Sequence, residues 1–293
     1  MVSDRVLRLR WPETLISQIA AHNFLLVVGA GASRNCVDSR GAKPLGWLEL
    51  LKQLNAKFGT GQMKAEVTKL LQHRQYLEAA EALKTHARSK SKEQDFLEML
   101  VTLTDGGAHA DRQFQPGKLH DTLLRLDPFV IVTTNYDRIL ERATNNGFNV
   151  HHSEFDNLAQ DVRTATPLIL KIHGTVDRKN GMVLTRSDYT RLRREGATAL
   201  EVLQALLLTR TALFVGYSFS DLDIQLLLEN ALGARGGAAA HYLLTSTSTP
   251  AHLREVLKFS YGTTLVTHKA DDYAEMARML ELLAESVETL RAS

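Results

Sequence analysis

Four short apolar runs in this chain each end in a segment of glycine, hydroxyl or amide residues. The segments are Gly29-Ala30-Gly31-Ala32-Ser33, Thr133-Thr134-Asn135-Tyr136-Asp137, Lys171-Ile172-His173-Gly174 and Gly216-Tyr217-Ser218. An open parallel sheet gathers its ligand-binding residues at the carboxyl ends of its strands. The four segments therefore predict a nucleotide pocket at that edge of a sheet.

The apolar runs alternate with longer amphipathic segments, which is typical of an α/β protein. We expect a Rossmann-like, doubly wound parallel sheet. The predicted strands are Phe24 to Val28, Phe129 to Thr133, Leu168 to Ile172, Met182 to Leu184, Leu213 to Gly216, His241 to Leu244 and Thr264 to Thr267. One helix is expected to begin near Pro12, and another after an N-cap at Ser220. The last helix is expected to run from about Asp271 to Leu290.

One stretch breaks this alternation. From Trp47 to about Met99 the apolar residues show only helical spacing, as at Leu48, Leu51 and Leu54. Turn-forming glycines and a proline follow at 105–107 and 116–117. We therefore predict a single domain over residues 1–293, with a Rossmann-like core of 1–46 and 116–293 and a helical insert of 47–115.

Composition excludes several classes of protein. With 44% hydrophobic and 23% charged residues in 293, the chain is expected to fold around a sizeable core. The net charge of +2 does not favour nucleic acid, and one cysteine, Cys36, excludes an internal disulfide and a four-cysteine zinc site. No signal-peptide core or membrane-length apolar run is present, so we expect a cytoplasmic protein without a membrane contact.

Each motif allows a purely structural interpretation as well as a functional one. Glycine in Gly29 to Ser33 allows a close approach to a pyrophosphate, but Arg34 replaces the third glycine of the dinucleotide fingerprint, so an ordinary strand-to-loop turn is the alternative. The following stretch, 35–46, is interpreted as a mobile cover over the pocket.

The other three motifs also allow structural roles. Asn135 and Asp137 suit a helix cap as well as a ligand. His173 suits proton transfer, with Gly174 leaving space beside the imidazole, although a strand-end histidine often serves structure alone. Ser218 suits a phosphate donor or an N-cap.

Taken together and in this order, the four motifs resemble the sirtuin-like superfamily. The resemblance is closer to its bacterial NAD-hydrolase branch, which is associated with defence against phage, and it covers nearly the whole chain apart from the insert. It implies catalytic roles for Asn135 and His173, with NAD+ as the substrate and no metal required. The positions that the resemblance implies for cofactor binding are Gly29, Ala30, Gly31, Ser33, Thr133, Asn135, Asp137, His173, Gly216 and Ser218.

Two departures separate this chain from the deacylases of the superfamily. Those enzymes carry a four-cysteine zinc module, which one cysteine cannot build. Their Pro-Asp-Phe-Arg segment is replaced by Lys43-Pro44-Leu45-Gly46-Trp47. The resemblance therefore implies an NAD+ glycohydrolase that releases ADP-ribose and nicotinamide and acts by NAD+ depletion in abortive infection. The alternatives are an NAD-dependent protein deacylase and a non-catalytic sensor of NAD or ADP-ribose.

Unrestrained NAD+ hydrolysis would harm the cell, and we expect no recognition domain within this chain. The resemblance to defence systems with separate partners implies a second, separately encoded protein. A HerA-like ring ATPase is the preferred partner and a short Argonaute-type module is the alternative. A homo-oligomer is also expected, without direct binding of nucleic acid.

Overall fold

A seven-stranded parallel sheet forms the centre of the molecule, with the strand order β3-β4-β2-β1-β5-β6-β7. The computed structural model describes residues 3–34, 36–152, 157–234, 240–270 and 272–293. The strands are β1 Phe24–Val28, β2 Val130–Thr133, β3 Asn149–His151, β4 Leu168–Lys171, β5 Thr211–Val215, β6 His241–Ser246 and β7 Thr263–His268. From β1 the chain adds β2, β3 and β4 on one side and then β5, β6 and β7 on the other, so the strand order reverses beside β1. The predicted Rossmann-like α/β fold is confirmed.

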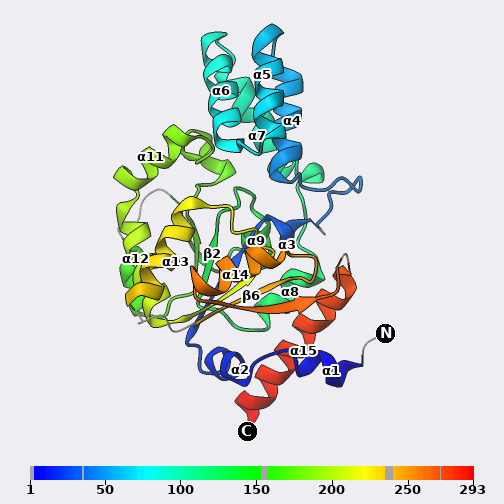
Figure 1. Cartoon of the computed structure of the whole chain (residues 1–293), viewed down its shortest axis with the longest axis vertical. Coiled ribbons are helices and arrows are strands. Elements are labelled where there is room, and N and C mark those ends of the chain that lie inside the picture. The colour runs from blue at the N-terminus through cyan, green and yellow to red at the C-terminus, as the bar shows by residue number, and fades with distance from the viewer. Residues whose placement is uncertain (1–2, 35, 153–156, 235–239, 271) are drawn as a thin grey trace.

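Helices surround the sheet (Figure 1). The α-helices are α1 Asp4–Arg8, α2 Glu13–Ala20, α3 Ala30–Ser33, α4 Trp47–Phe58, α5 Gly61–Gln72, α6 Tyr76–Ser89, α7 Glu93–Asp105, α8 Lys118–Leu124, α9 Ile139–Ala143, α10 Leu158–Arg163, α11 Arg186–Glu195, α12 Ala197–Thr209, α13 Leu222–Ala234, α14 Ala251–Phe259 and α15 Tyr273–Ala292. Two 3-10 helices are η1 Ala110–Arg112 and η2 Val176–Gly181. In the described parts of the chain, no helix is long and apolar enough to cross a membrane.

Both faces of the sheet are buried. Along β1, Leu25 and Val27 face a cluster formed with α10, α12 and α13, whereas Phe24, Leu26 and Val28 face a cluster formed with α2, α8 and α15. A strand that is covered on both faces has no polar side to present to water. The continuous apolar runs in the sequence follow from this arrangement.

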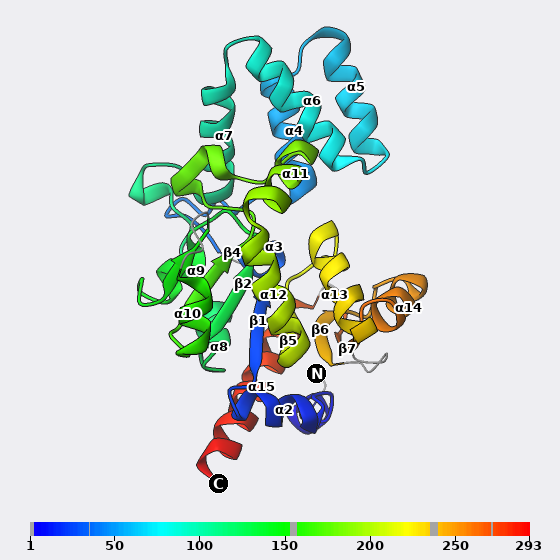
Figure 2. The same ribbon diagram turned by 90° about the vertical axis from the view of Figure 1, so that its left-hand side faces the viewer.

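Helices α4 to α7 form a separate lobe beyond the carboxyl edge of the sheet, away from both chain ends (Figures 1 and 2). The lobe has its own apolar cluster around Leu51, Leu54, Leu83 and Phe96. These helices occupy the stretch in which the sequence shows only helical spacing. The four helices, α4 to α7, are called the insert below.

The predicted strand at Met182–Leu184 is wrong. This segment is extended but pairs with no described strand, and it follows η2 beneath the insert. Met182 and Leu184 pack in the apolar cluster of the insert, while Val183 packs against the core. The three residues are apolar because two lobes bury them.

The edge strand β3, in contrast, is missing from the predicted strands. Asn149 and Val150 are exposed, and only His151 is buried. The strand pairs on one side, with β4. Because this edge strand is short and partly exposed to solvent, its sequence contains no apolar run from which a strand could be predicted.

Candidate active site

The backbone segments that follow the paired parallel strands β1 and β5 approach each other closely at the glycines of two motifs, and this close approach is called the β1–β5 crossing below. The N–H of Gly29 donates to the carbonyl of Val215 at 3.0 Å, and the N–H of Gly31 donates to that of Gly216 at 2.8 Å. A Cβ on Gly29 would lie 2.5 Å from the Gly216 oxygen, and one on Gly216, at φ +64°, would overlap the Ala32 nitrogen. The glycines thus allow two backbones to pack, and the N–H groups of Gly29 and Gly31 are already bonded within the protein.

A cavity of about 620 Å³ opens above this crossing, between the core and the insert. Its volume is within the usual range for small-molecule sites. Seven of the predicted site residues line it: Gly29, Ala30, Ser33, Asn135, Asp137, His173 and Ser218. The structure therefore gathers parts of all four motifs in one place.

Three predicted positions are absent from the lining of this cavity: Gly31, Thr133 and Gly216. Gly31 and Gly216 belong to the backbone crossing. The hydroxyl of Thr133 donates to the carbonyl of Val28 at 2.7 Å and accepts from the N–H of Asn135 at 3.0 Å. These residues support the floor of the cavity from below.

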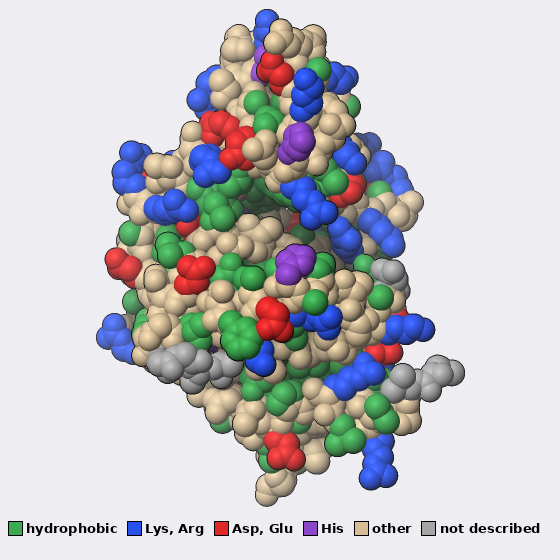
Figure 3. Space-filling model, in the orientation of Figure 1, with side chains coloured by type: hydrophobic (Ala, Val, Ile, Leu, Met, Phe, Trp, Pro, Cys, Tyr) green, Lys and Arg blue, Asp and Glu red, His purple; other side chains and the backbone are tan. Residues whose placement is uncertain are grey.

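The insert supplies the opposite wall, which the sequence motifs do not reveal. Trp47 begins α4, Arg74 and Gln75 come from the turn between α5 and α6, and Tyr76 begins α6. Pro44 and Leu45 of the predicted cover also line the cavity, whereas Asn35 lies outside the described residues. The surface is hollowed between the two lobes, with Lys and Arg side chains on either side (Figure 3).

Asn135 is held beside the end of β1. Its Nδ2 donates to the Ser33 hydroxyl at 3.3 Å, and that hydroxyl donates to Oδ2 of Asp137 at 3.4 Å. Asn135 is 8% exposed. Because one hydroxyl connects the first and second motifs, the amide has a fixed position at the cavity wall.

Asp137 lies in a buried, highly charged region. Its Oδ1 accepts the N–H of Ile139, the first residue of α9, at 3.1 Å, although the N-cap residue of that helix is Arg138. Burial raises the pKa of Asp137 to about 6, although the nearby Lys171 ammonium acts to lower it. Lys171 donates to the Asp137 carbonyl and lies 2.9 Å from Glu141. The Asp137 carboxyl group can therefore change its charge near neutral pH.

His173 lies at the end of β4 and faces two residues that the sequence analysis did not assign to the site. Its Nε2 is 2.8 Å from Oδ2 of Asp221, without the angle of a hydrogen bond. The Tyr189 hydroxyl donates to the same carboxylate oxygen at 2.6 Å, and its ring lies edge-on to the imidazole at 5.2 Å. Burial acts to raise the pKa of Asp221, but His173 and Tyr189 lower it to about 2. Asp221 is therefore a carboxylate at neutral pH.

The expected N-cap at Ser220 is also wrong. Oδ1 of Asp221 accepts the N–H of Ile224 at 2.9 Å and so caps the first turn of α13. Ser220 instead shares a hydrogen bond of 2.8 Å with Ser218, at the exposed rim of the cavity. An Asp in a helix-capping position that follows a glycine-containing strand end was the available signal for Asp221.

Gly174 has a different neighbour from the one expected. Its φ is +81°, and a Cβ on it would lie 2.8 Å from the carbonyl oxygen of Gly181. Val183 then donates to the His173 carbonyl at 3.0 Å. The glycine thus permits a turn beneath the Gly181–Met182 backbone.

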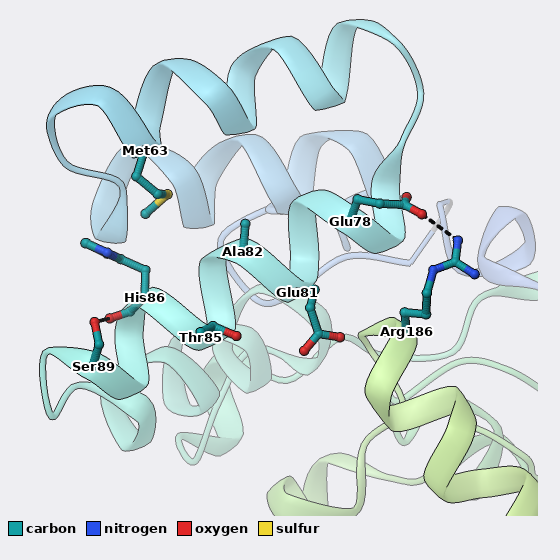
Figure 4. Close-up of a pocket in the computed structure, with 8 residues that line it drawn as sticks. All are labelled: Met63, Glu78, Glu81, Ala82, Thr85, His86, Ser89 and Arg186. Carbon is teal, nitrogen blue, oxygen red and sulfur yellow. Dashed lines mark hydrogen bonds and ion pairs between the residues drawn. The ribbon is translucent and has the colours of Figure 1, made fainter.

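A second pocket, of about 550 Å³, lies on the insert (Figure 4). It is lined mainly by α6, with Met63 from α5 and Arg186 from α11. Glu78 and Arg186 form an ion pair there and line both pockets. None of the four motifs reaches this second pocket, so the cavity above the sheet is the candidate active site. Among the described residues, no three His, Cys, Asp or Glu side chains gather as metal ligands would.

Comparison with known proteins identifies similar sequences. Residues 130–265 match the family model described as a SIR2-like domain. An NAD(+) hydrolase ThsA of Acinetobacter baumannii is 24% identical over 218 residues, which are 74% of this chain and 40% of that protein. A Defense-associated sirtuin 2 of Bacillus subtilis is 30% identical over 120 residues, 38% of this chain and 11% of that protein.

A further NAD(+) hydrolase ThsA, from Bacillus cereus, is 29% identical over 117 residues, 39% of this chain and 25% of that protein. The chain thus spans at most 40% of the length of these three relatives. The matched family region begins at β2 and contains the second, third and fourth motifs. Residues 130–265 are therefore similar to a SIR2-like domain, and the resemblance of the chain to sirtuin-like defence proteins is confirmed.

Proposed function

We propose that this protein is an NAD+ glycohydrolase that cleaves the bond between nicotinamide and ribose. The observation that carries the proposal is the gathering of Asn135 and His173, with Ser33 and Asp137, in one cavity above the β1–β5 crossing. The similarity to proteins named NAD(+) hydrolase supports the same conclusion.

The chemistry assigns a different task to each side chain. Nicotinamide leaves NAD+ as a neutral molecule with the electrons of the C–N bond, and positive charge develops on the ribose. The Asn135 amide aligns a water molecule with the anomeric carbon. The water oxygen bonds to that carbon while its proton passes to the His173 imidazole. A positioned base of this kind contributes about a hundred- to ten-thousandfold in rate.

We further propose a cytoplasmic role in antiphage defence, in which activity depletes NAD+. The name of the Bacillus subtilis relative supports a defensive role. Such an activity needs restraint, so we propose control by a separately encoded partner, preferably a HerA-like ring ATPase, with a short Argonaute-type module as the alternative. Assembly into a homo-oligomer belongs to the same proposal.

Chromatography of NAD+ incubated with the purified protein tests the activity. We expect wild type to form nicotinamide and ADP-ribose, alone or together with the protein encoded beside it. Asn135→Ala and His173→Ala should lose about a hundredfold or more of the rate, while circular dichroism shows that both remain folded. His252→Ala is the matched control, because His252 is exposed on α14. Full activity of a folded His173→Ala protein would remove the imidazole from the mechanism.

A further inference from the structure

The carboxylate of Asp221 is shared among three groups. Oδ2 lies 2.8 Å from Nε2 of His173 and accepts the Tyr189 hydroxyl at 2.6 Å, while Oδ1 accepts the N–H of Ile224 at 2.9 Å. Asp221 is 7% exposed and His173 is 6% exposed. A carboxylate bound on both oxygens by groups from α11 and α13 has little freedom to rotate.

This arrangement distinguishes the two nitrogens of His173. Nε2 lies 2.8 Å from an Asp221 carboxylate oxygen, and although the angle is not that of a hydrogen bond, the negative charge at this distance favours a proton on that nitrogen. His173 also lines the cavity, so Nδ1 is the nitrogen that remains for a ligand. A neutral imidazole with its proton on Nε2 carries its lone pair on Nδ1, as a proton acceptor requires.

We propose that Asp221 is a positioning residue that fixes the tautomer and orientation of His173, with Tyr189 holding the carboxylate in place. The inference deepens the proposed hydrolase function, on which it rests for its kinetic consequence. Nδ1 then receives the proton of the attacking water, while Nε2 keeps its own proton against Asp221. The imidazolium formed in this step is stabilised by the adjacent negative charge.

Other titratable groups surround the pair. Asp223 from α13 interacts electrostatically with both Asp221 and His173, but its carboxylate is bound by Arg193 at 2.7 Å. Tyr136 and Tyr217 lie in the same cavity wall, and burial raises the pKa of each phenol. At neutral pH, Asp221 is therefore the anion in direct contact with the imidazole.

Asp221→Asn separates the two roles of this side chain. Asparagine still caps a helix, so α13 keeps its first turn, but its neutral amide does not select the tautomer. In the serine-protease triad the equivalent change costs about ten-thousandfold in kcat. We expect a loss of at least about a hundredfold in kcat with KM almost unchanged. Tyr189→Phe should give a smaller loss of about three- to tenfold, because the carboxylate remains.

Asp223→Asn is the matched control, since it removes a buried carboxylate two residues further on, in the first turn of α13, that pairs with Arg193, whereas His173 pairs with Asp221. It should leave kcat within about twofold of wild type. If kcat of Asp223→Asn is as low as that of Asp221→Asn, the loss of rate comes from removing negative charge near α13 and not from losing the contact between Asp221 and His173. That result would overturn the proposal.

The tautomer itself is measured without substrate, by ¹⁵N NMR of protein labelled at histidine. The chain has 11 histidines, so the His173 signal is assigned by its loss in His173→Ala. We expect the Nε2–H form in wild type and a mixture in Asp221→Asn. An unchanged tautomer in Asp221→Asn overturns the proposal whatever happens to kcat. Because this readout needs no turnover, it decides on Asp221 even if wild type fails to hydrolyse NAD+.

Discussion

At the residue scale, burial gives ordinary side chains unusual properties. Asp137 and Asp221 are both buried at the same edge of the sheet, yet their surroundings move their pKa values in opposite directions. Burial dominates for Asp137, whereas the contacts with His173 and Tyr189 dominate for Asp221. One carboxyl group can therefore become neutral near pH 6 while the other stays charged.

The raised pKa of Asp137, about 6 against an ordinary 3.8, predicts a pH dependence of stability. Between about pH 4 and 6 the folded state holds this proton more tightly than the unfolded state does. The free energy of unfolding contributed by Asp137 therefore rises as pH falls through this range, by about 2 to 3 kcal/mol in total. Urea unfolding from pH 4.5 to 7.5 measures it.

Asp137→Asn should remove this part of the pH dependence, because the amide does not titrate but still accepts the Ile139 N–H. Asp121→Asn, at an exposed site on α8, is the control and should leave the dependence as in wild type. If the Asp137→Asn and wild-type profiles are parallel, Asp137 does not titrate in this range.

At the element scale, the glycines that follow β1 and β5 allow the two backbone segments to pack against each other. Their backbones approach so closely that a side chain on either strand end would enter the other. This close approach fixes the backbone that leads to Ser33 and Ser218, which lie beyond the ends of the two strands. The phosphate-binding role that the sequence assigns to these glycines stays a prediction, and for Gly29 and Gly31 it does not rest on free N–H groups.

Gly216→Ala should therefore destabilise the protein strongly. The new Cβ overlaps the Ala32 backbone at a positive φ, and we expect a loss of about 2 to 4 kcal/mol in the free energy of unfolding. Gly233→Ala is the matched control, because Gly233 lies in α13 with open space around it. There alanine should stabilise by about 0.5 to 1 kcal/mol. Equal effects at the two sites in urea unfolding would contradict the crossing.

At the scale of the whole molecule, the insert closes the cavity and is tied to the core through α6 and α11. Nζ of Lys84 lies 3.0 Å from both carboxylate oxygens of Asp188, and both side chains are nearly buried. The N–H of Ser187 donates to Glu81 at 2.8 Å nearby. These contacts hold the wall that carries Arg74 and Tyr76 over the strand ends.

Lys84→Met should weaken this attachment, because it removes one cation from a buried carboxylate. Asp188 keeps Arg191, at 3.0 Å, and the Thr185 hydroxyl, so we expect a loss of about 2 kcal/mol, less than for a fully isolated charge. Lys179→Met is the control. Lys179 also connects the core to the insert, through an ion pair with Glu98 at 3.4 Å, but both side chains are exposed. We expect the loss of this ion pair to lower the free energy of unfolding by less than about 1 kcal/mol.

Hydrogen exchange provides the second readout for the same pair of variants. Faster exchange in α6 and α11 of Lys84→Met, with the sheet unchanged, would locate the effect between the lobes. If the two variants lose equal free energy of unfolding, the buried Lys84–Asp188 pair contributes no more to stability than the exposed Lys179–Glu98 pair.

The sequence by itself determined the parallel sheet, the helical character of the insert and the edge at which the motifs meet. Local periodicity records whether a segment is buried on one face, on both or as a helix, and the end of a buried strand must lie at an edge. For this reason seven of the ten predicted site positions line one cavity. The apolar pattern at Met182–Leu184 was misleading because burial alone does not say what covers a segment.

Only the tertiary structure decided which residues from different segments touch. The sequence placed the helix cap at Ser220 rather than Asp221, and nothing local indicates that an oxygen of Asp221 meets His173, which is 48 positions earlier in the chain. The wall formed by Trp47, Arg74 and Tyr76 likewise depends on how two lobes dock. Such contacts are set by the packing of whole elements, and a local pattern carries no information about the partner on the other side.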